Sequence, residues 1–210
     1  MATTLVAISD LHGNLPDDLP EGDVLAIAGD VCPISDHEVG FQARWLTDVF
    51  YRWIDSLPHA EVIWIAGNHD FVCQTANWEP AGRGHYLLDS GIELGGISFH
   101  GTPWVPKLEG WAFYANDERL AEIYARIPPV DVLISHGPPL GYGDRVWSGR
   151  EAGSPALRDR LIAAPPQVCV FGHIHEAHGR WTLGATELAN VSHVDVEYRV
   201  RPHAWAVFEL

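Results

Sequence analysis

Short apolar runs that end in polar residues recur along this chain and constrain its fold more than any other feature. The runs are rich in valine, isoleucine and leucine, as is typical of buried strands. They cover Leu5–Ser9, Val24–Ala28, Val62–Ala66, Ile97–His100, Val130–Ser135 and Val168–Phe171. Helix signals or loops separate the runs, and this alternation predicts a largely parallel sheet.

Three helices are predicted between the strands. The sequence Ser35-Asp-His-Glu38 has the form of a capping box, and apolar side chains follow it at four-residue steps. These side chains are Phe41, Trp45, Val49, Trp53 and Leu57. We expect this face, including its two tryptophans, to pack on the core. Asn116 and the pair Ser154-Pro155 are predicted to start two further helices.

The last part of the chain, from Arg180 to Leu210, lacks helix signals. Its alternating runs, Val191–Tyr198 and Ala204–Phe208, predict antiparallel strands and a second sheet packed on the first. The predicted fold class is therefore α/β, with two packed mixed β-sheets flanked by helices. A length of 210 residues suits one core, so we expect a single domain over residues 1–210.

Charge, hydropathy and cysteine content limit the partners and the location of this protein. The 13 Lys and Arg residues face 28 Asp and Glu residues, a net charge of −15, so we expect no long nucleic acid as a partner. No apolar stretch reaches the length of a membrane span, and the N-terminus lacks a basic leader. Three scattered cysteines argue against a disulfide framework. We expect a cytoplasmic protein without membrane contact, and its oligomeric state is left open.

Polar residues gather at the carboxyl ends of five predicted strands. The blocks contain Asp10, His12 and Asn14; Asp30; Asn68, His69 and Asp70; His136; and His173 with His175. Strand ends of open α/β sheets meet at one crevice, so distant segments can form one site. Imidazole nitrogens mixed with carboxylate and amide oxygens suit Mn²⁺, Fe²⁺, Zn²⁺, Co²⁺ or Ni²⁺. The pattern therefore predicts a metal site.

The ordered blocks D-x-H, G-D, G-N-H-D, a lone His and G-H-x-H resemble the calcineurin-like metallophosphoesterase superfamily. Further segments, such as residues 102–104, 109–113 and 135–144, resemble its metallophosphoesterase-domain-containing branch, some members of which hydrolyse cyclic nucleotides. The resemblance implies two divalent ions, with manganese expected, and a bridging carboxylate from Asp30. It assigns the ligands of the two ions as Asp10, His12, Asp30 and His175, and as Asp30, Asn68, His136 and His173.

The resemblance also implies a role for His69 on the phosphate side of the ions. It would stabilise charge or protonate the leaving oxygen, with Asp70 fixing its tautomer. Two divalent ions against the carboxylates of Asp10 and Asp30 leave the site positive in an acidic protein. Such ions can lower the pKa of a bridging water, so that hydroxide attacks phosphorus directly.

The substrate is expected to be a small phosphodiester. A nucleotide is favoured, such as a 2′,3′-cyclic nucleotide, because the strain in its ring favours hydrolysis. Candidate substrate contacts are Asn14, His100, Trp104, Trp111 and Phe113. The aromatic residues could stack on a base or pack over the sheet. A phosphomonoesterase and a dinucleoside polyphosphate hydrolase stay open as alternatives, as does a metal-dependent scaffold or binding module with vestigial activity. Six other histidines are expected to be structural: His37, His59, His85, His178, His193 and His203.

Overall fold

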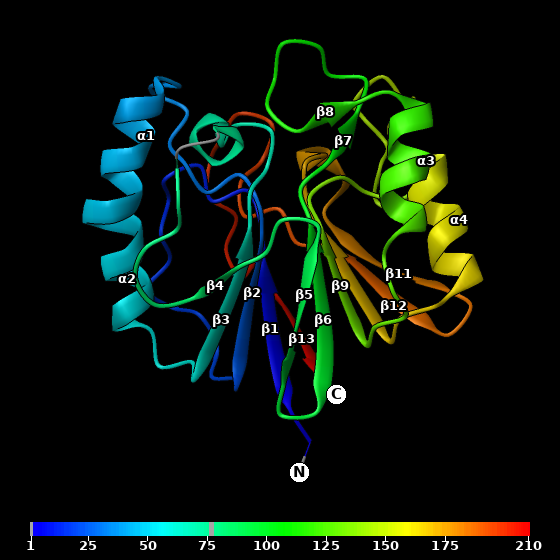
Figure 1. Ribbon diagram of the computed structural model, residues 1–210, viewed down its shortest axis with the longest axis horizontal. Helices are drawn as coiled ribbons and strands as arrows, with labels where there is room; N and C mark the ends of the chain where they lie inside the picture. The colour runs from blue at the N-terminus through cyan, green and yellow to red at the C-terminus, as the bar shows by residue number, and fades with distance from the viewer. Residues whose placement is uncertain (1, 76–77) are drawn as a thin grey trace.

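The structure is a computed structural model that describes residues 2–75 and 78–210. Two sheets face each other at its centre, and helices cover the outer face of each sheet (Figure 1). The strands are β1 (Thr4–Ile8), β2 (Val24–Ala28), β3 (Glu61–Ile65), β4 (His85–Tyr86), β5 (Ser90–Leu94), β6 (Ile97–Thr102), β7 (Val105–Pro106), β8 (Tyr114–Ala115), β9 (Val132–Ser135), β10 (Val168–Phe171), β11 (Gly179–Leu183), β12 (Thr186–Asn190) and β13 (Ala206–Glu209). The helical segments are α1 (Val39–Trp45), η1 (Leu46–Phe50), α2 (Tyr51–Ser56), η2 (Phe71–Gln74), α3 (Asp117–Ala125), α4 (Pro155–Ala163) and η3 (His175–Ala177).

The first sheet has the strand order β13-β1-β2-β3-β4, and the second has the order β11-β12-β10-β9-β6-β5. Strands β1 to β4 run parallel, as do β12, β10, β9 and β6. Antiparallel partners lie at the edges, where β13 pairs with β1, β11 with β12, and β5 with β6. The predicted fold class, two packed mixed sheets flanked by helices, is confirmed.

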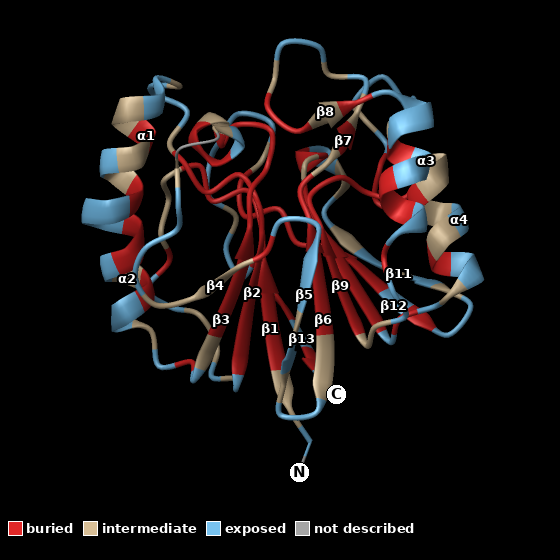
Figure 2. Cartoon of the chain, in the orientation of Figure 1, coloured by how far each residue is buried: buried red, intermediate tan, exposed pale blue. Residues whose placement is uncertain are grey.

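The central strands are buried on both faces (Figure 2). In β1, Leu5 and Ala7 join a cluster with residues of the second sheet, including Val132. Their neighbours Val6 and Ile8 join a different cluster, with side chains of the helices beside the first sheet. Since strand side chains alternate between faces, one strand contributes to two cores, which explains why these runs are continuously apolar.

The first helix begins later than its capping box predicts. Glu38 is the N-cap of α1, and its carboxylate accepts a hydrogen bond from the N–H of Phe41 at 2.7 Å. The helix then continues through the π-helical segment η1 into α2. The predicted core face is wrong at Val49, which is 42% exposed. Most fully buried are instead Gln42, Leu46, Phe50, Tyr51 and Ile54.

The physical reason is the helix geometry: η1 places an extra residue in one turn and rotates the following side chains. Trp45 and Trp53 pack against the buried cluster at its border, so the packing prediction is confirmed for both. The other two helices begin as predicted, because the side chains of Asn116 and Ser154 accept hydrogen bonds from the first turns of α3 and α4.

The predicted strand over Val191–Tyr198 is wrong. The sheet strands of this region are β11 and β12, which form an antiparallel hairpin, and β13. Residues 191–198 contain isolated β-bridges and a turn instead. The turn forms at Asp195, whose side chain accepts hydrogen bonds from the N–H groups of Glu197 and Arg199. In the part of the chain that the structure describes, every helix is too short or too polar to cross a membrane.

Candidate metal centre

The predicted ligands lie directly after five strands, at one edge of the two facing sheets. Loops after β1, β2 and β3 bring them from the first sheet, and loops after β9 and β10 bring them from the second. Four of these residues have backbones in the left-handed region, which is strained for side chains other than glycine. They are Asp10 (φ 54°), His12 (φ 45°), Asp30 (φ 53°) and His173 (φ 66°). These four predicted ligand residues therefore hold their side chains on strained backbone.

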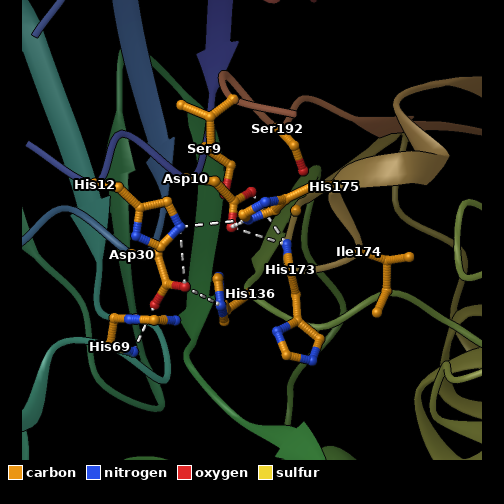
Figure 3. A network of polar contacts seen from close by, with 12 residues as sticks. Ser9, Asp10, His12, Asp30, His69, His136, His173, Ile174, His175 and Ser192 are labelled. Atoms are coloured by element: carbon orange, nitrogen blue, oxygen red, sulfur yellow. Dashed lines mark hydrogen bonds and ion pairs between the residues drawn. The ribbon is translucent and has the colours of Figure 1, made fainter. Parts of the chain in front are cut away.

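Asp30 lies at the centre of the cluster (Figure 3). Its Oδ1 accepts a hydrogen bond from the N–H of His69 at 2.8 Å. Its Oδ2 lies 3.4 Å from Nε2 of His136 and 3.6 Å from Nε2 of His12. Burial favours the neutral acid, but the charges of His136 and His69 outweigh it and hold the pKa of Asp30 well below its usual range. The Asp30 carboxylate thus contacts histidines from the loops of both sheets.

Asp10 forms the second acidic position. Nε2 of His175 lies 3.3 Å from its Oδ1, and the backbone N–H of His173 donates to both carboxylate oxygens at 3.1 Å. Nε2 of His12 lies 3.3 Å from Nε2 of His175. Burial favours the neutral acid here too, yet His175 outweighs it and lowers the pKa of Asp10.

Two of the histidines are oriented by backbone carbonyls. Nδ1 of His136 lies 2.9 Å from the carbonyl oxygen of Ala28, and Nδ1 of His175 lies 3.1 Å from that of Asp195. In each ring the other nitrogen, Nε2, faces the cluster, and that of His136 lies 3.0 Å from Oδ1 of Asn68. Ligating histidines in proteins commonly use their second ring nitrogen in this way.

The donor set fits divalent ions. Three overlapping groups have ligand atoms within 4.8 Å of one another: Asp10 with His12 and His175, His12 with Asp30 and His69, and Asp10 with Asp30 and His136. Nearly all of these side chains are buried, and their mixture of nitrogen and oxygen suits borderline divalent metals. Gly172 lies so close to the Asp10 carboxylate that a Cβ atom there would collide with it.

The two predicted ligand sets differ in how completely they converge. Asp10, His12 and His175 form one of the groups, and Asp30 adjoins them through His12. In the second predicted set, Asp30, Asn68 and His136 come together, but the ring of His173 belongs to none of the three groups. That ring lies 5.2 Å from the ring of His136 and points away from Asp10 in Figure 3.

His69 and Asp70 do not form the pair that the sequence predicts. The Asp70 carboxylate accepts hydrogen bonds from the backbone N–H groups of Cys32 and Gly67 at 2.8 Å and of Val31 at 3.2 Å. It therefore ties the loop after β2 to the loop after β3. The ring of His69 instead has a histidine partner: Nε2 of His37 lies 2.9 Å from its Nδ1. His37, which is expected from the sequence to be structural, therefore contacts the predicted catalytic ring.

A cavity of about 320 Å³ opens directly over the cluster. Its floor contains Asp30, His69 and His175, and its wall contains Trp111, Trp147 and Tyr198. The rings of Trp111 and His69 have centroids 4.3 Å apart, so the predicted substrate contact Trp111 does lie at the site.

The other four predicted substrate contacts do not line this cavity. Trp104 donates a hydrogen bond to Oδ2 of Asp89 at 2.7 Å. Phe113 is buried in the core and packs against the ring of Trp104. His100 is buried within β6. Asn14 donates to the carbonyl oxygen of Leu11 at 3.0 Å and lines a separate cavity. Packing of the loops, the alternative to base stacking, accounts for Trp104 and Phe113.

Three residues at the site escape the sequence motifs. Trp147 and Tyr198 lie in loops that follow the fourth and fifth blocks, and His37 lies just before α1. Trp147 is 89% exposed and lines the cavity, so it is a candidate binding residue. Tyr198 packs edge-on against His12 and His175, with ring centroids 5.0 and 5.4 Å away.

Comparison with known proteins agrees with this geometry. The family model described as calcineurin-like phosphoesterase matches residues 3–177. Metallophosphoesterase domain-containing protein 1 from Homo sapiens is 32% identical over an alignment of 230 residues. The match covers 94% of this chain and 68% of that protein. The same protein from Mus musculus matches equally well.

A solved structure shows a similar fold. The crystal structure of phosphopantetheinyl hydrolase from Mycobacterium tuberculosis has a TM-score of 0.59 and 20% sequence identity, and the match covers 100% of this chain and 96% of that one. The resemblance to the superfamily and to its metallophosphoesterase-domain-containing branch is confirmed. The chain belongs to the calcineurin-like phosphoesterase family, whose members hydrolyse phosphoesters with divalent metals.

Proposed function

We propose that this chain is a dinuclear-metal phosphodiesterase that hydrolyses small phosphodiesters, with 2′,3′-cyclic nucleotides as the leading substrate class. The observation that carries the proposal is the shared position of Asp30. One of its oxygens faces both His12 and His136, two histidines that belong to different groups of candidate ligands. A carboxylate between two sets of nitrogen donors is the arrangement that two neighbouring ions need.

The proposed ligands are those expected from the sequence: Asp10, His12, Asp30, Asn68, His136, His173 and His175. Divalent ions held there, manganese by preference, would neutralise phosphate charge and activate water at neutral pH. The side chains have separate tasks. Asp10 and Asp30 hold negative charge in a buried site, and the backbone carbonyls of Ala28 and Asp195 orient the rings of His136 and His175.

His69 is the proposed group that acts on the substrate itself. It lines the cavity, and its ring lies 4.7 Å from that of His12, measured between centroids. Alkoxide leaving groups are poor, so a hydrogen bond from this ring to the leaving oxygen would stabilise the charge that develops there as the bond breaks. Asp70 supports the site from behind, because it joins two of the loops that hold the ligands.

The cavity wall supports a substrate with a flat or apolar group. Trp111, Trp147 and Tyr198 surround the cluster, and aromatic faces stack readily on nucleobases. A volume of about 320 Å³ suits a small ester better than a polymer. The strained ring of a 2′,3′-cyclic nucleotide would favour its opening to a monophosphate.

We also propose that residues 1–210 act as one domain in a reducing cytoplasm. The three cysteines, Cys32, Cys73 and Cys169, are free and buried, which fits a compartment that keeps thiols reduced.

The test is a comparison of three substrates with Mn²⁺-loaded protein: an aryl phosphodiester, the matching aryl phosphomonoester, and 2′,3′-cyclic AMP. We expect the diester to be hydrolysed faster than the monoester, and the cyclic nucleotide to be opened to a monophosphate. Preference for the monoester would overturn the diesterase proposal. Full metal occupancy without turnover of any ester would instead favour a metal-dependent binding module.

A further inference from the structure

We propose that His37 is a positioning residue that donates a hydrogen bond to Nδ1 of His69 and thereby keeps the single proton of the neutral His69 ring on Nε2. The inference rests on the proposed function of the site. It starts from the contact of 2.9 Å between Nε2 of His37 and Nδ1 of His69.

The backbone of His69 is already fixed by other groups. Its N–H donates to Oδ1 of Asp30 at 2.8 Å, and its carbonyl oxygen accepts from the side-chain amide of Gln42 at 2.7 Å. The same Gln42 side chain accepts from the N–H of Val72 at 3.0 Å. The remaining freedom of His69 is therefore the orientation and tautomer of its ring.

His37 is held in position to control that ring. Its ring centroid lies 5.4 Å from that of Phe71 and 5.5 Å from that of Trp111, which itself packs on His69 at 4.3 Å. The neighbouring carboxylate of Glu38 caps α1. His37 thus faces His69 from the residue before the N-cap of α1.

The direction of the hydrogen bond follows from the chemistry of the substrate. Phosphoester oxygens accept hydrogen bonds, so the ring nitrogen of His69 that faces them must carry a proton. A neutral imidazole has one proton, and placing it on Nε2 leaves Nδ1 as an acceptor. A carboxylate partner at Nδ1 can only accept, so in the neutral ring it would hold the proton on Nδ1 and leave Nε2 without one. A histidine can donate, and the one carboxylate next to His69 in sequence, Asp70, is occupied by backbone N–H groups.

The test uses two isosteric variants that differ in the ability to donate. His37→Gln keeps an N–H donor near the position of Nε2, and His37→Glu offers only acceptor oxygens. His37→Ala removes the partner, and His85→Gln serves as a control because His85 pairs with Glu61 in β3, away from the site. The tautomer of His69 is read from its imidazole ¹⁵N chemical shifts in the diamagnetic Zn²⁺-loaded protein, assigned by comparison with His69→Ala.

We expect wild type and His37→Gln to show the proton on Nε2, and His37→Glu to show it on Nδ1. Turnover of an alkyl ester, which has a poor leaving group, should fall about 10- to 100-fold in His37→Glu and His37→Ala. Turnover of a 4-nitrophenyl ester should change much less in the same proteins, because its leaving group needs little help.

The inference is overturned if the His37→Glu variant retains the Nε2 proton, or if every His37 variant loses both substrates to the same extent, since the latter marks a structural role. Failure of wild-type protein to hydrolyse any ester would instead overturn the proposed function. The ¹⁵N shifts decide the tautomer in either case.

Discussion

The floor and the wall of the cavity are built on different principles. The floor contains buried polar side chains that hydrogen bonds hold in place: Asp30 accepts from the N–H of His69, and Nδ1 of His175 lies 3.1 Å from the carbonyl oxygen of Asp195. The wall is aromatic and partly exposed, and Trp147 reaches 89% exposure. On the proposed function, the floor would carry the chemistry and the wall would select the substrate.

Removal of the shared carboxylate should have the largest effect. Asp30→Ala deletes the oxygen that faces both His12 and His136, so we expect loss of bound metal and activity at background level. Metal analysis of the dialysed protein and an ester hydrolysis assay check both parts. A variant that keeps two ions and normal turnover would show that the floor does not depend on Asp30.

Removal of His69 should separate rate from metal binding. His69→Ala is expected to keep the metals and to lose about 10²–10⁴-fold in turnover of esters with poor leaving groups. Titration calorimetry with Mn²⁺ measures the first property, and steady-state kinetics the second. Because His69 also lies in a group with His12 and Asp30, an emptied metal site in this variant would make it a ligand instead.

Truncation of the wall should change substrate binding more than catalysis. Trp147→Ala removes an exposed indole at the cavity, and loss of stacking should raise KM for a nucleotide about 10-fold with little change in kcat. The fold should be unaffected because the side chain makes little buried contact. An unchanged KM for nucleotide substrates would remove Trp147 from the wall.

Trp104 provides the matched control with the smallest expected effect. Its indole donates to Asp89 and packs on Phe113, so Trp104→Phe should cost about 1 kcal/mol of unfolding free energy for the lost hydrogen bond. KM for the nucleotide should stay at the wild-type value. Denaturant unfolding and the same kinetic assay test this, and a raised KM would extend the wall to Trp104.

The difference between the cavity floor and the cavity wall also explains which residues could be predicted from the sequence. The floor residues follow strands at fixed spacing, so the ordered motifs from Asp10 to His175 already indicate a common site, and the sheet topology brings them together. The fold class and the starts of α3 and α4 follow from equally local signals.

The wall and the support of His69 depend on loops, which meet through tertiary structure. Nothing near Trp147 or Tyr198 in sequence marks either as a neighbour of the cluster, and Tyr198 lies in a turn where alternation predicts a strand. Adjacency in sequence pairs His69 with Asp70, but the chain directs that carboxylate to backbone N–H groups and supplies His37 instead. The π-helical segment likewise has no signal in the four-residue spacing.

The central claim is that Asp30 is shared by two ions, and metal stoichiometry tests it most directly. Purified wild-type protein, saturated with Mn²⁺ and freed of excess metal, should contain two ions per chain by elemental analysis, and Asp30→Ala should contain fewer under the same treatment. A wild-type value of one ion, or two ions retained in Asp30→Ala, would contradict the account.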